Sequence, residues 1–454
     1  MNNILVVKFG GTQLKDPDSV RRACNLVADI YEKEKPDLLP VVVSAPGKIN
    51  GEYRGAKVTD LLERIYNNEH PNINLEEVKH RVKSLASSLT LNLDFLDASI
   101  SELERQIVDN VSDKQKNKDR SYSAIVGFGE KVQVETVGRF FDLSFNSLPN
   151  RWLNYNEFGM LTQEYRDADV LPESLSMIEN SLSKLEGIVF LPGFISYNSR
   201  GELTTLGRDG SNFTATKIAE ALLAKEVRIY SAEPGVRRAH PLFVPDAEII
   251  LELTYSEARE FSELGAKVIN SKSIAPAQNE NIPIFVVDEN GKGTKIYSHV
   301  SLEHMGAKII ASVPNQSVLT IQYEQDKAGI LEKVANSFAS AGINIDAIAD
   351  ERHGMSLAFS GDKDIGKVLE KLRVDKYILE NHLARISIIG EGMENQVGVI
   401  EKIGKCYRES GISFKMISQA MPQLNVTSFI DGRHERIAVR RLYDAFFGNG
   451  KELK

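Results

Sequence analysis

A buried strand, a glycine turn and an amphipathic helix follow one another repeatedly in the first part of the chain, and this order constrains the fold most. Residues 4–11, ILVVKFGG, form an apolar run that ends in a glycine turn. Residues 16–34 follow with apolar side chains at helical spacing, and residues 38–47, LLPVVVSAPG, begin the pattern again. The alternation predicts an α/β domain with a mostly parallel sheet flanked by helices, whose ligand sites form at the carboxyl ends of the strands.

Two later junctions extend the pattern. Residues 123–130, SAIVGFGE, precede a predicted helix over 131–142, so we place Glu130 at a further strand-to-helix turn. Residues 187–195, GIVFLPGFI, lead through a polar stretch into a predicted helix over 211–225. Because the pattern persists to about residue 300, we predict a first domain over residues 1–300.

An internal repeat then replaces the alternation. AGILEKVANSFASAGIN and VGVIEKIGKCYRESGIS have the same layout, and each lies within a series of strand, helix, strand, strand and a further helix. The repeat predicts two small ferredoxin-like modules over residues 312–378 and 382–450, and interleaving of the two remains open. A purely structural dimerisation unit is one interpretation of such modules.

Composition excludes several functional classes. A chain of 454 residues predicts more than one domain, and a net charge of −8 argues against nucleic-acid binding through a basic surface. The two cysteines, Cys24 and Cys406, are too few and too far apart for a disulfide framework or a thiolate zinc site. No signal peptide, transit peptide or membrane-spanning run is recognisable. We therefore expect a cytoplasmic protein that acts on small molecules, without nucleic-acid or membrane partners.

The KFGG turn is a candidate phosphate site. Lys8 ends the first strand, and Gly10 and Gly11 leave the backbone bare enough for a phosphate to approach. Neither GxxxxGK[ST] nor GxGxxG occurs in the sequence, so the familiar nucleotide-binding loops are not supported. The alternative interpretation is a solvated lysine beside a tight turn.

A second candidate is GELTTLGRDGSNFTATKIAEALL, residues 201–223. Arg208 stands just before a predicted helix that Ser211 would cap, and a helix N-terminus with a guanidinium receives carboxylates and phosphates well. The alternative is an ordinary capped helix with a surface arginine. Likewise, Glu130 could be only an acidic residue at the start of a helix.

Six motifs in order resemble the aspartokinase family: KFGGT, VVVSAPGK, GFGE, TTLGRDGSN, VPDAEII and LGAKVI. The resemblance covers essentially the whole chain. It implies an amino-acid kinase fold followed by two ACT domains. It also implies an enzyme that transfers the γ-phosphoryl group of ATP, with Mg²⁺, to the side-chain carboxylate of L-aspartate. This reaction is the first step toward lysine, threonine and methionine.

The resemblance also assigns roles to individual residues. Lys8 would lie between aspartate and the transferred phosphoryl group, and Gly10, Gly11 and Ser44 would line that phosphate region. Aspartate would be bound by Arg208 at a carboxylate and by Glu130 at the α-ammonium, with Thr59 and Ser211 in the same pocket. The nucleotide contacts would be Ser231, Arg237 and Lys267.

The chain departs from the family pattern near the nucleotide. SAEPGVRRAHP, residues 231–241, stands where the family has TDVDG, a tyrosine and an Asp-Pro pair, so that Arg237 replaces the tyrosine. Asn212 replaces an aspartate, Asp209 an uncharged residue and Gln13 a serine. Either Arg237 and Arg238 take over nucleotide contacts or phosphoryl transfer is impaired. We favour retained activity.

The resemblance further implies a homo-oligomer that assembles through the ACT domains and is inhibited by an end-product amino acid, lysine or threonine. Two alternatives belong to other classes. One is a catalytically weakened regulator whose working part is the ACT pair, and the other is a kinase for a different amino acid. Turnover of ATP with and without aspartate distinguishes the three.

Overall fold

A computed structural model describes residues 3–49, 56–112, 117–233, 235–264, 269–299, 305–322, 329–351, 353–361, 363–372, 374, 376–419 and 424–448. Lys267, a predicted nucleotide contact, lies outside these residues. The chain forms two compact units. The first unit comprises residues 1–236, 251–255 and 268–298, and the second comprises residues 237–250, 256–267 and 299–454. No helix in the described ranges is long and apolar enough to span a membrane.

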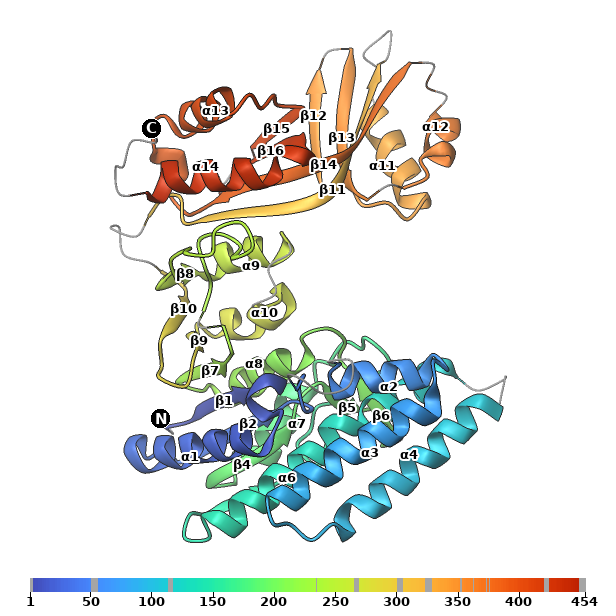
Figure 1. The fold of residues 1–454 in the computed structure, drawn as a ribbon, viewed down its shortest axis with the longest axis vertical. Helices are drawn as coiled ribbons and strands as arrows, with labels where there is room; N and C mark the ends of the chain where they lie inside the picture. Colours follow the sequence, from blue (N-terminus) through green and yellow to red (C-terminus); the bar gives the residue numbers. More distant parts are fainter. Residues whose placement is uncertain are drawn as a thin grey trace. The chain divides into compact units, whose positions relative to one another are not determined.

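The first unit is built on an eight-stranded sheet, in the order β3-β4-β2-β1-β7-β9-β10-β8 (Figure 1). All neighbouring pairs are parallel except β9 with β10. This sheet confirms the predicted α/β class. The strands are β1 (Leu5–Phe9), β2 (Leu38–Val43), β3 (Asn150–Trp152), β4 (Gly187–Pro192), β7 (Glu226–Tyr230), β8 (Glu252–Thr254), β9 (Ile284–Val287) and β10 (Gly293–Tyr297). A short hairpin pairs β5 (Ile195–Tyr197) with β6 (Leu203–Thr205).

Helices cover this sheet and also form a cluster of their own. The first helix begins after Asp16, whose carboxylate accepts a hydrogen bond from the backbone N–H of Ser19 at 2.8 Å, with Pro17 at the first helical position. Four consecutive helices, α2 to α5, bury their own apolar cluster. The helices are α1 (Pro17–Glu34), α2 (Val58–Tyr66), α3 (Pro71–Ser88), α4 (Asp94–Ser112), α5 (Lys118–Val126), α6 (Phe128–Ser144), α7 (Ser174–Leu182), α8 (Gly210–Leu222) and α10 (Ser271–Asn279). The helix between the last two in sequence, α9 (Tyr255–Glu263), belongs to the second unit except for Tyr255.

One predicted strand is a helix. The residues before Glu130 form α5, so GFGE joins two helices and does not end a strand. Asn117 starts α5 by accepting hydrogen bonds from the backbone N–H groups of Asp119 and Arg120 at 3.0 and 3.3 Å. A short apolar run such as SAIV does not distinguish a buried strand from a buried helix, and here the cap and the neighbouring helices decide.

The second unit contains a six-stranded sheet in the order β12-β13-β11-β14-β16-β15. Two long strands, β11 and β14, form its centre (Figure 1). The elements are β11 (Ile309–Gln322), α11 (Ile330–Ser340), β12 (Ala347–Glu351), β13 (Gly354–Ser360), α12 (Gly366–Leu372), β14 (Tyr377–Ile389), α13 (Val399–Glu409), β15 (Met416–Gln419), β16 (Asn425–Asp431) and α14 (Glu435–Phe447). Each half of the unit therefore has the predicted series of strand, helix, strand, strand and helix.

The two halves share their central strands. The C-terminal part of β11 pairs with β13 and with the start of β14, whereas residues 309–313 pair with residues 385–389 at the end of β14. Residues 383–389 of β14 in turn pair with β16. The first residues of β11 thus add a strand to the sheet of the second half. They pair with the backbone groups of β14 that would otherwise be exposed at a sheet edge.

Two segments from the predicted first domain belong to the second unit. In one of them, the backbone carbonyl of Arg238 accepts a hydrogen bond from Ile310 N–H at 2.7 Å. In the other, Glu257 and Lys308 form an ion pair at 2.7 Å in which both side chains are buried. Glu257 also accepts a hydrogen bond from Glu391 N–H at 2.7 Å. Both segments therefore belong to the unit of the C-terminal sheet, although they precede the predicted domain boundary at residue 300.

We expect the Lys308→Met substitution to destabilise the second unit by about 3–5 kcal/mol, because it leaves the buried Glu257 carboxylate without its cation. Thermal melting of the intact chain measures the loss. Glu380→Ala is the matched control, since the Lys415–Glu380 pair, also 2.7 Å long, is about one third exposed on both sides and should contribute at most about 1 kcal/mol. The double variant Glu257→Leu/Lys308→Met should recover much of the stability. A double variant no more stable than the single one would contradict this expectation.

Candidate active site

The loops after β1, β2 and β4 meet at the carboxyl edge of the parallel sheet. Gly47 N–H donates to the carbonyl of Gly11 at 2.9 Å, which joins the first two loops. Gly193 N–H, after β4, donates to the carbonyl of Val43 at 2.9 Å. Ligand sites in open parallel sheets form at this edge. The predicted site residues Lys8, Gly10, Gly11 and Ser44 all lie here.

Glycine is required where the first two loops touch. A Cβ atom on Gly11 would lie 2.7 Å from the carbonyl oxygen of Ala45, and one on Gly47 would lie 2.5 Å from the carbonyl of Gly11. Both distances are shorter than atoms tolerate, so a larger residue would push the loops apart. Gly11 therefore has a packing role in addition to its predicted place beside a phosphate.

Lys8 is a buried cation at this edge. It is 8% exposed, and no described residue accepts a hydrogen bond from its ammonium group. Burial lowers the pKa of Lys8, and the charge of Lys57 lowers it further. The charges of Asp209 and, less strongly, Glu130 raise it. Because the ammonium lies near two carboxylates without pairing with either, it is available to an anionic ligand.

Glu130, in the first turn of α6, is the buried acid of the site. One carboxylate oxygen accepts a hydrogen bond from Ala45 N–H at 3.2 Å, and the other is buried without a hydrogen-bond partner among the described residues. Burial raises the pKa of Glu130 to about 8, although the hydrogen bond from Ala45 and the charge of Lys8 both act to lower it. A buried acceptor with no donor indicates a place for a donor from a ligand.

The start of α8 supplies the third part of the site. Gly193 packs directly on Ser211, since a Cβ atom on Gly193 would lie 2.6 Å from the Ser211 Cβ. Arg208 is exposed and pairs with no described residue. The prediction that Ser211 caps the helix is wrong, because α8 begins at Gly210 after a left-handed Asp209 and has no side-chain cap. The backbone N–H groups of this first turn therefore have no side-chain acceptor.

The remaining predicted residues are more scattered. Thr59 lies in the first turn of α2, two residues after Lys57. Ser231 directly follows β7, and its hydroxyl accepts a hydrogen bond from Glu233 N–H at 3.3 Å. Arg237 lies in the second unit, where its guanidinium donates to the carbonyl of Ala247 at 2.7 Å.

Several residues of the site were not predicted. The N–H of Ala45 and the close approach of Gly47 belong to the SAPG turn, whose Pro-Gly pair already indicated a tight turn. Lys57 has no sequence signal that distinguishes it from a surface lysine. Asp209 gave a signal, as an acidic residue within a glycine-rich turn.

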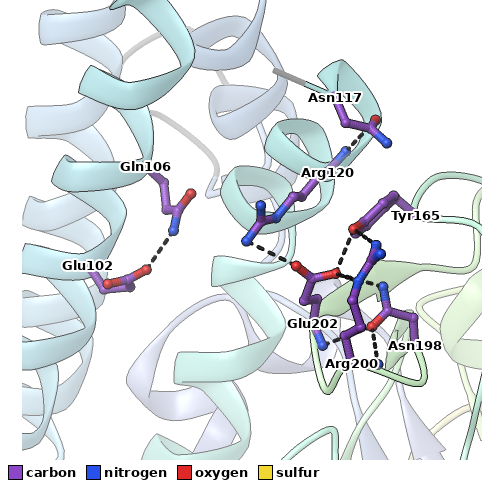
Figure 2. Close-up of polar contacts among 8 residues, drawn as sticks. All are labelled: Glu102, Gln106, Asn117, Arg120, Tyr165, Asn198, Arg200 and Glu202. Carbon is purple, nitrogen blue, oxygen red and sulfur yellow. Dashed lines mark hydrogen bonds and ion pairs between the residues drawn. The ribbon is translucent and has the colours of Figure 1, made fainter. Parts of the chain in front are cut away.

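A polar cluster holds the hairpin that leads into the Arg208 turn (Figure 2). Glu202, at its centre, accepts hydrogen bonds from Tyr165 OH at 2.6 Å, Asn198 Nδ2 at 2.9 Å and Arg200 Nε at 2.8 Å, and pairs with Arg120 of α5 at 3.0 Å. The pKa of Glu202 is lowered to about 2, and the hydrogen bond from the Tyr165 hydroxyl is the largest cause. The cluster ties β5 and β6 to α5, only a few residues before Arg208.

Comparison with known proteins identifies the architecture. A model of the amino acid kinase family matches residues 3–288. The chain belongs to that family. An ACT domain model matches residues 386–446, within the second predicted module. The predicted order of an amino-acid kinase domain followed by ACT domains is therefore confirmed.

Relatives within this amino acid kinase family include aspartokinases. An aspartokinase of Geobacillus stearothermophilus is 29% identical over 98% of this chain and 97% of its own length. The structure of E. coli aspartokinase III with aspartate and ADP aligns with 98% of this chain and 100% of its own, at a TM-score of 0.79 and 22% identity. The same protein with lysine and aspartate aligns over the same shares, at a TM-score of 0.74 and 22% identity. These two structures establish the shared fold.

Proposed function

We propose that this amino acid kinase is an aspartate kinase that transfers the γ-phosphoryl group of ATP to the side-chain carboxylate of L-aspartate, giving 4-phospho-L-aspartate and ADP. The observation that supports it best is a pair of buried ionisable groups at one sheet edge that have hydrogen-bonding capacity left among the described residues, the Lys8 ammonium and the second carboxyl oxygen of Glu130. An amino acid with an α-ammonium and an anionic side chain complements both. The aspartokinase relatives favour aspartate among such acceptors.

The chemistry needs few special groups. The side-chain carboxylate of aspartate has an ordinary pKa of about 4, so it is already ionised at neutral pH and needs no general base. One of its oxygens attacks the γ-phosphorus, and the bond from that phosphorus to the bridging oxygen of ADP breaks. Lys8 would neutralise charge on the transferring group, with Gly10, Gly11 and Ser44 lining the phosphate region.

The acceptor would be oriented by charged groups on the helices. Glu130 would receive the α-ammonium, Arg208 would bind a carboxylate with two parallel hydrogen bonds, and Thr59 and Ser211 would complete the pocket. Arg208 is free for this role, because no described residue pairs with it.

The nucleotide would be ATP, with Ser231, Arg237 and Lys267 as its contacts. Arg237 now donates to Ala247, so a role toward the nucleotide would require its guanidinium to exchange that partner. The described residues contain no group of three acidic, histidine or cysteine side chains that could hold a metal. Mg²⁺ would then be bound mainly by the nucleotide phosphates and would supply further neutralisation of their charge.

The C-terminal modules would provide regulation. We assign residues 1–300 to catalysis and residues 312–378 and 382–450 to two ACT domains, which would form a homo-oligomer and bind lysine or threonine. The protein would act in the cytoplasm at the start of lysine, threonine and methionine biosynthesis. The relative from E. coli in complex with lysine supports an amino-acid effector.

We expect one end-product amino acid to stabilise the folded chain and to inhibit it about 5- to 150-fold, as is typical of allosteric coupling. The measurement titrates lysine, threonine and methionine separately and follows both activity and thermal melting. If none of the three shifts either signal at millimolar concentration, the modules serve assembly only.

The function itself is tested by a coupled assay of ADP release with and without aspartate. Aspartate-dependent release supports the proposal. Binding of lysine or threonine without turnover would indicate a regulator, and turnover only with another amino acid would indicate a different kinase.

We expect Arg208→Ala to raise the Michaelis constant for aspartate by about 100-fold, since a charge-assisted bidentate contact contributes roughly 1.5–3 kcal/mol. Stability should change little because the side chain is exposed. Arg208→Lys should recover only part of the affinity, because an ammonium cannot form the bidentate contact. An unchanged Michaelis constant would place the arginine outside the site.

A further inference from the structure

Asp209 adopts a backbone conformation that most residues avoid. Its φ and ψ angles are 65° and 17°, in the left-handed region, where glycine fits without strain and other residues are uncommon. An acidic residue at such a position, beside a candidate active site, suggests that its side chain compensates for the strain.

The Asp209 carboxylate connects the beginnings of two helices. One oxygen accepts hydrogen bonds from Asn270 N–H at 2.9 Å and Ser273 Oγ at 3.2 Å, both at the start of α10. The other accepts from Asn212 Nδ2 at 2.6 Å, in the first turn of α8. All four residues belong to the first unit. Since all three partners are donors, the position demands a group that only accepts, and an ionised carboxylate is such a group.

The connection lies beside the proposed site. Arg208 and Ser211, proposed for aspartate, flank Asp209 in the sequence. Among the charges near Lys8, that of Asp209 opposes the lowered pKa of this lysine most, so the Asp209 carboxylate lies near the Lys8 ammonium. Asn270, at the other end of the connection, caps α10. The buried Asn212 has its amide nitrogen committed to Asp209, and its amide oxygen has no hydrogen-bond partner in the described chain. Asp209 thus also determines which way that amide faces.

We propose that Asp209 is a positioning residue for phosphoryl transfer, whose carboxylate fixes the distance between the acceptor-binding turn before α8 and the start of α10. The proposal rests on the proposed aspartate kinase function. Phosphoryl transfer depends on alignment of the two substrates, and a displacement of about 1 Å can cost roughly 100-fold in rate. Asp209 acts through Asn270, Ser273 and Asn212 and does not itself touch the reacting atoms.

The test is the substitution Asp209→Gly, which removes the carboxylate and suits the left-handed backbone. We expect kcat to fall about 100-fold, an unchanged or slightly higher melting temperature, and faster amide hydrogen exchange at residues 270–273. A purely stabilising role would lower the melting temperature and leave kcat unchanged, which would overturn the proposal. Unchanged hydrogen exchange in α10 would also overturn it.

Two further variants sharpen the result. Asp169→Gly is the matched control, because Asp169 pairs with Lys272 in the same turn of α10 at 2.8 Å through an exposed carboxylate, and it should alter neither rate nor exchange. Asp209→Asn tolerates the same left-handed backbone but replaces one of the two acceptor oxygens with a donor, so one side of the connection is lost and kcat should still fall. A normal kcat for Asp209→Asn would show that the connection does not position the substrates. The exchange measurement needs no substrate, so it tests Asp209 even if the wild type fails to phosphorylate aspartate.

Discussion

Replacing Lys8 with alanine is expected to lower kcat by about 100- to 1,000-fold and to leave aspartate binding nearly unchanged. A preorganised donor aimed at charge that develops in the transition state contributes on this scale. The Lys8 ammonium is buried and donates no hydrogen bond to a described residue, so its charge is available to the transferring phosphoryl group. Steady-state kinetics with aspartate and ATP varied separately, together with calorimetric binding of aspartate, measures both quantities.

The control for Lys8 is Lys15→Ala. Lys15 follows the same glycine turn, and its Nζ lies 3.9 Å from Asp16 Oδ2. At this distance the ion pair is weak, so its loss should have little effect. Its loss should change kcat less than twofold. If Lys8→Ala instead had normal turnover and reduced stability, the KFGG segment would be a structural turn only.

Replacing Glu130 with glutamine is expected to weaken aspartate binding by about 10- to 150-fold and to stabilise the ligand-free protein at neutral pH. The first effect follows because a neutral amide replaces the carboxylate that would pair with the α-ammonium, and charged hydrogen bonds contribute about 1.5–3 kcal/mol. The second follows from burial, which raises the pKa of Glu130 to about 8 from an ordinary value of 4.5.

The sign of the pH dependence follows from proton binding. Between about pH 4.5 and 8 the folded protein keeps the Glu130 proton, whereas the unfolded chain has lost it. The free energy of unfolding of the wild type therefore falls as pH rises through this range, by at most about 1.4 kcal/mol per pH unit from this group. Glutamine does not ionise, so it contributes no pH dependence at this position. The melting temperature of Glu130→Gln relative to the wild type should therefore rise from pH 5 to pH 8 and then level off.

Two measurements complete this test. Glu135→Gln on the same helix is the control, because Glu135 already pairs with Arg139 at 2.7 Å near the surface, and it should reproduce neither effect. Aspartate binding to the wild type at pH 7 should release protons, as the arriving ammonium favours ionised Glu130, and calorimetry in buffers of different ionisation enthalpy detects them. A melting difference that does not vary with pH would show that Glu130 is ionised in the ligand-free protein.

The sequence was sufficient for the fold class and for the order of the kinase domain and the modules because the relevant signals are local. Alternation of buried strand, glycine turn and helix specifies a parallel sheet, since parallel strands need crossover connections. The repeated pattern around residues 328 and 397 predicted two modules, and the structure has the corresponding elements in each half of its second sheet. The order of motifs was likewise enough to predict the kinase family.

Tertiary structure decided what depends on residues far apart in the chain. Burial between the loop after β2 and the start of α6 gives Glu130 its raised pKa, although its sequence context is that of an ordinary helix-start charge. Asp209 reaches Asn270 across 61 positions, which no local pattern reveals. Residues 237–250 pack with the C-terminal sheet, since backbone hydrogen bonds and buried side chains, and not position in the chain, determine where a segment belongs. Local periodicity therefore determined most of the elements that form, and long-range burial and hydrogen bonding determined which ionisable side chains are buried with hydrogen-bonding capacity left for a ligand.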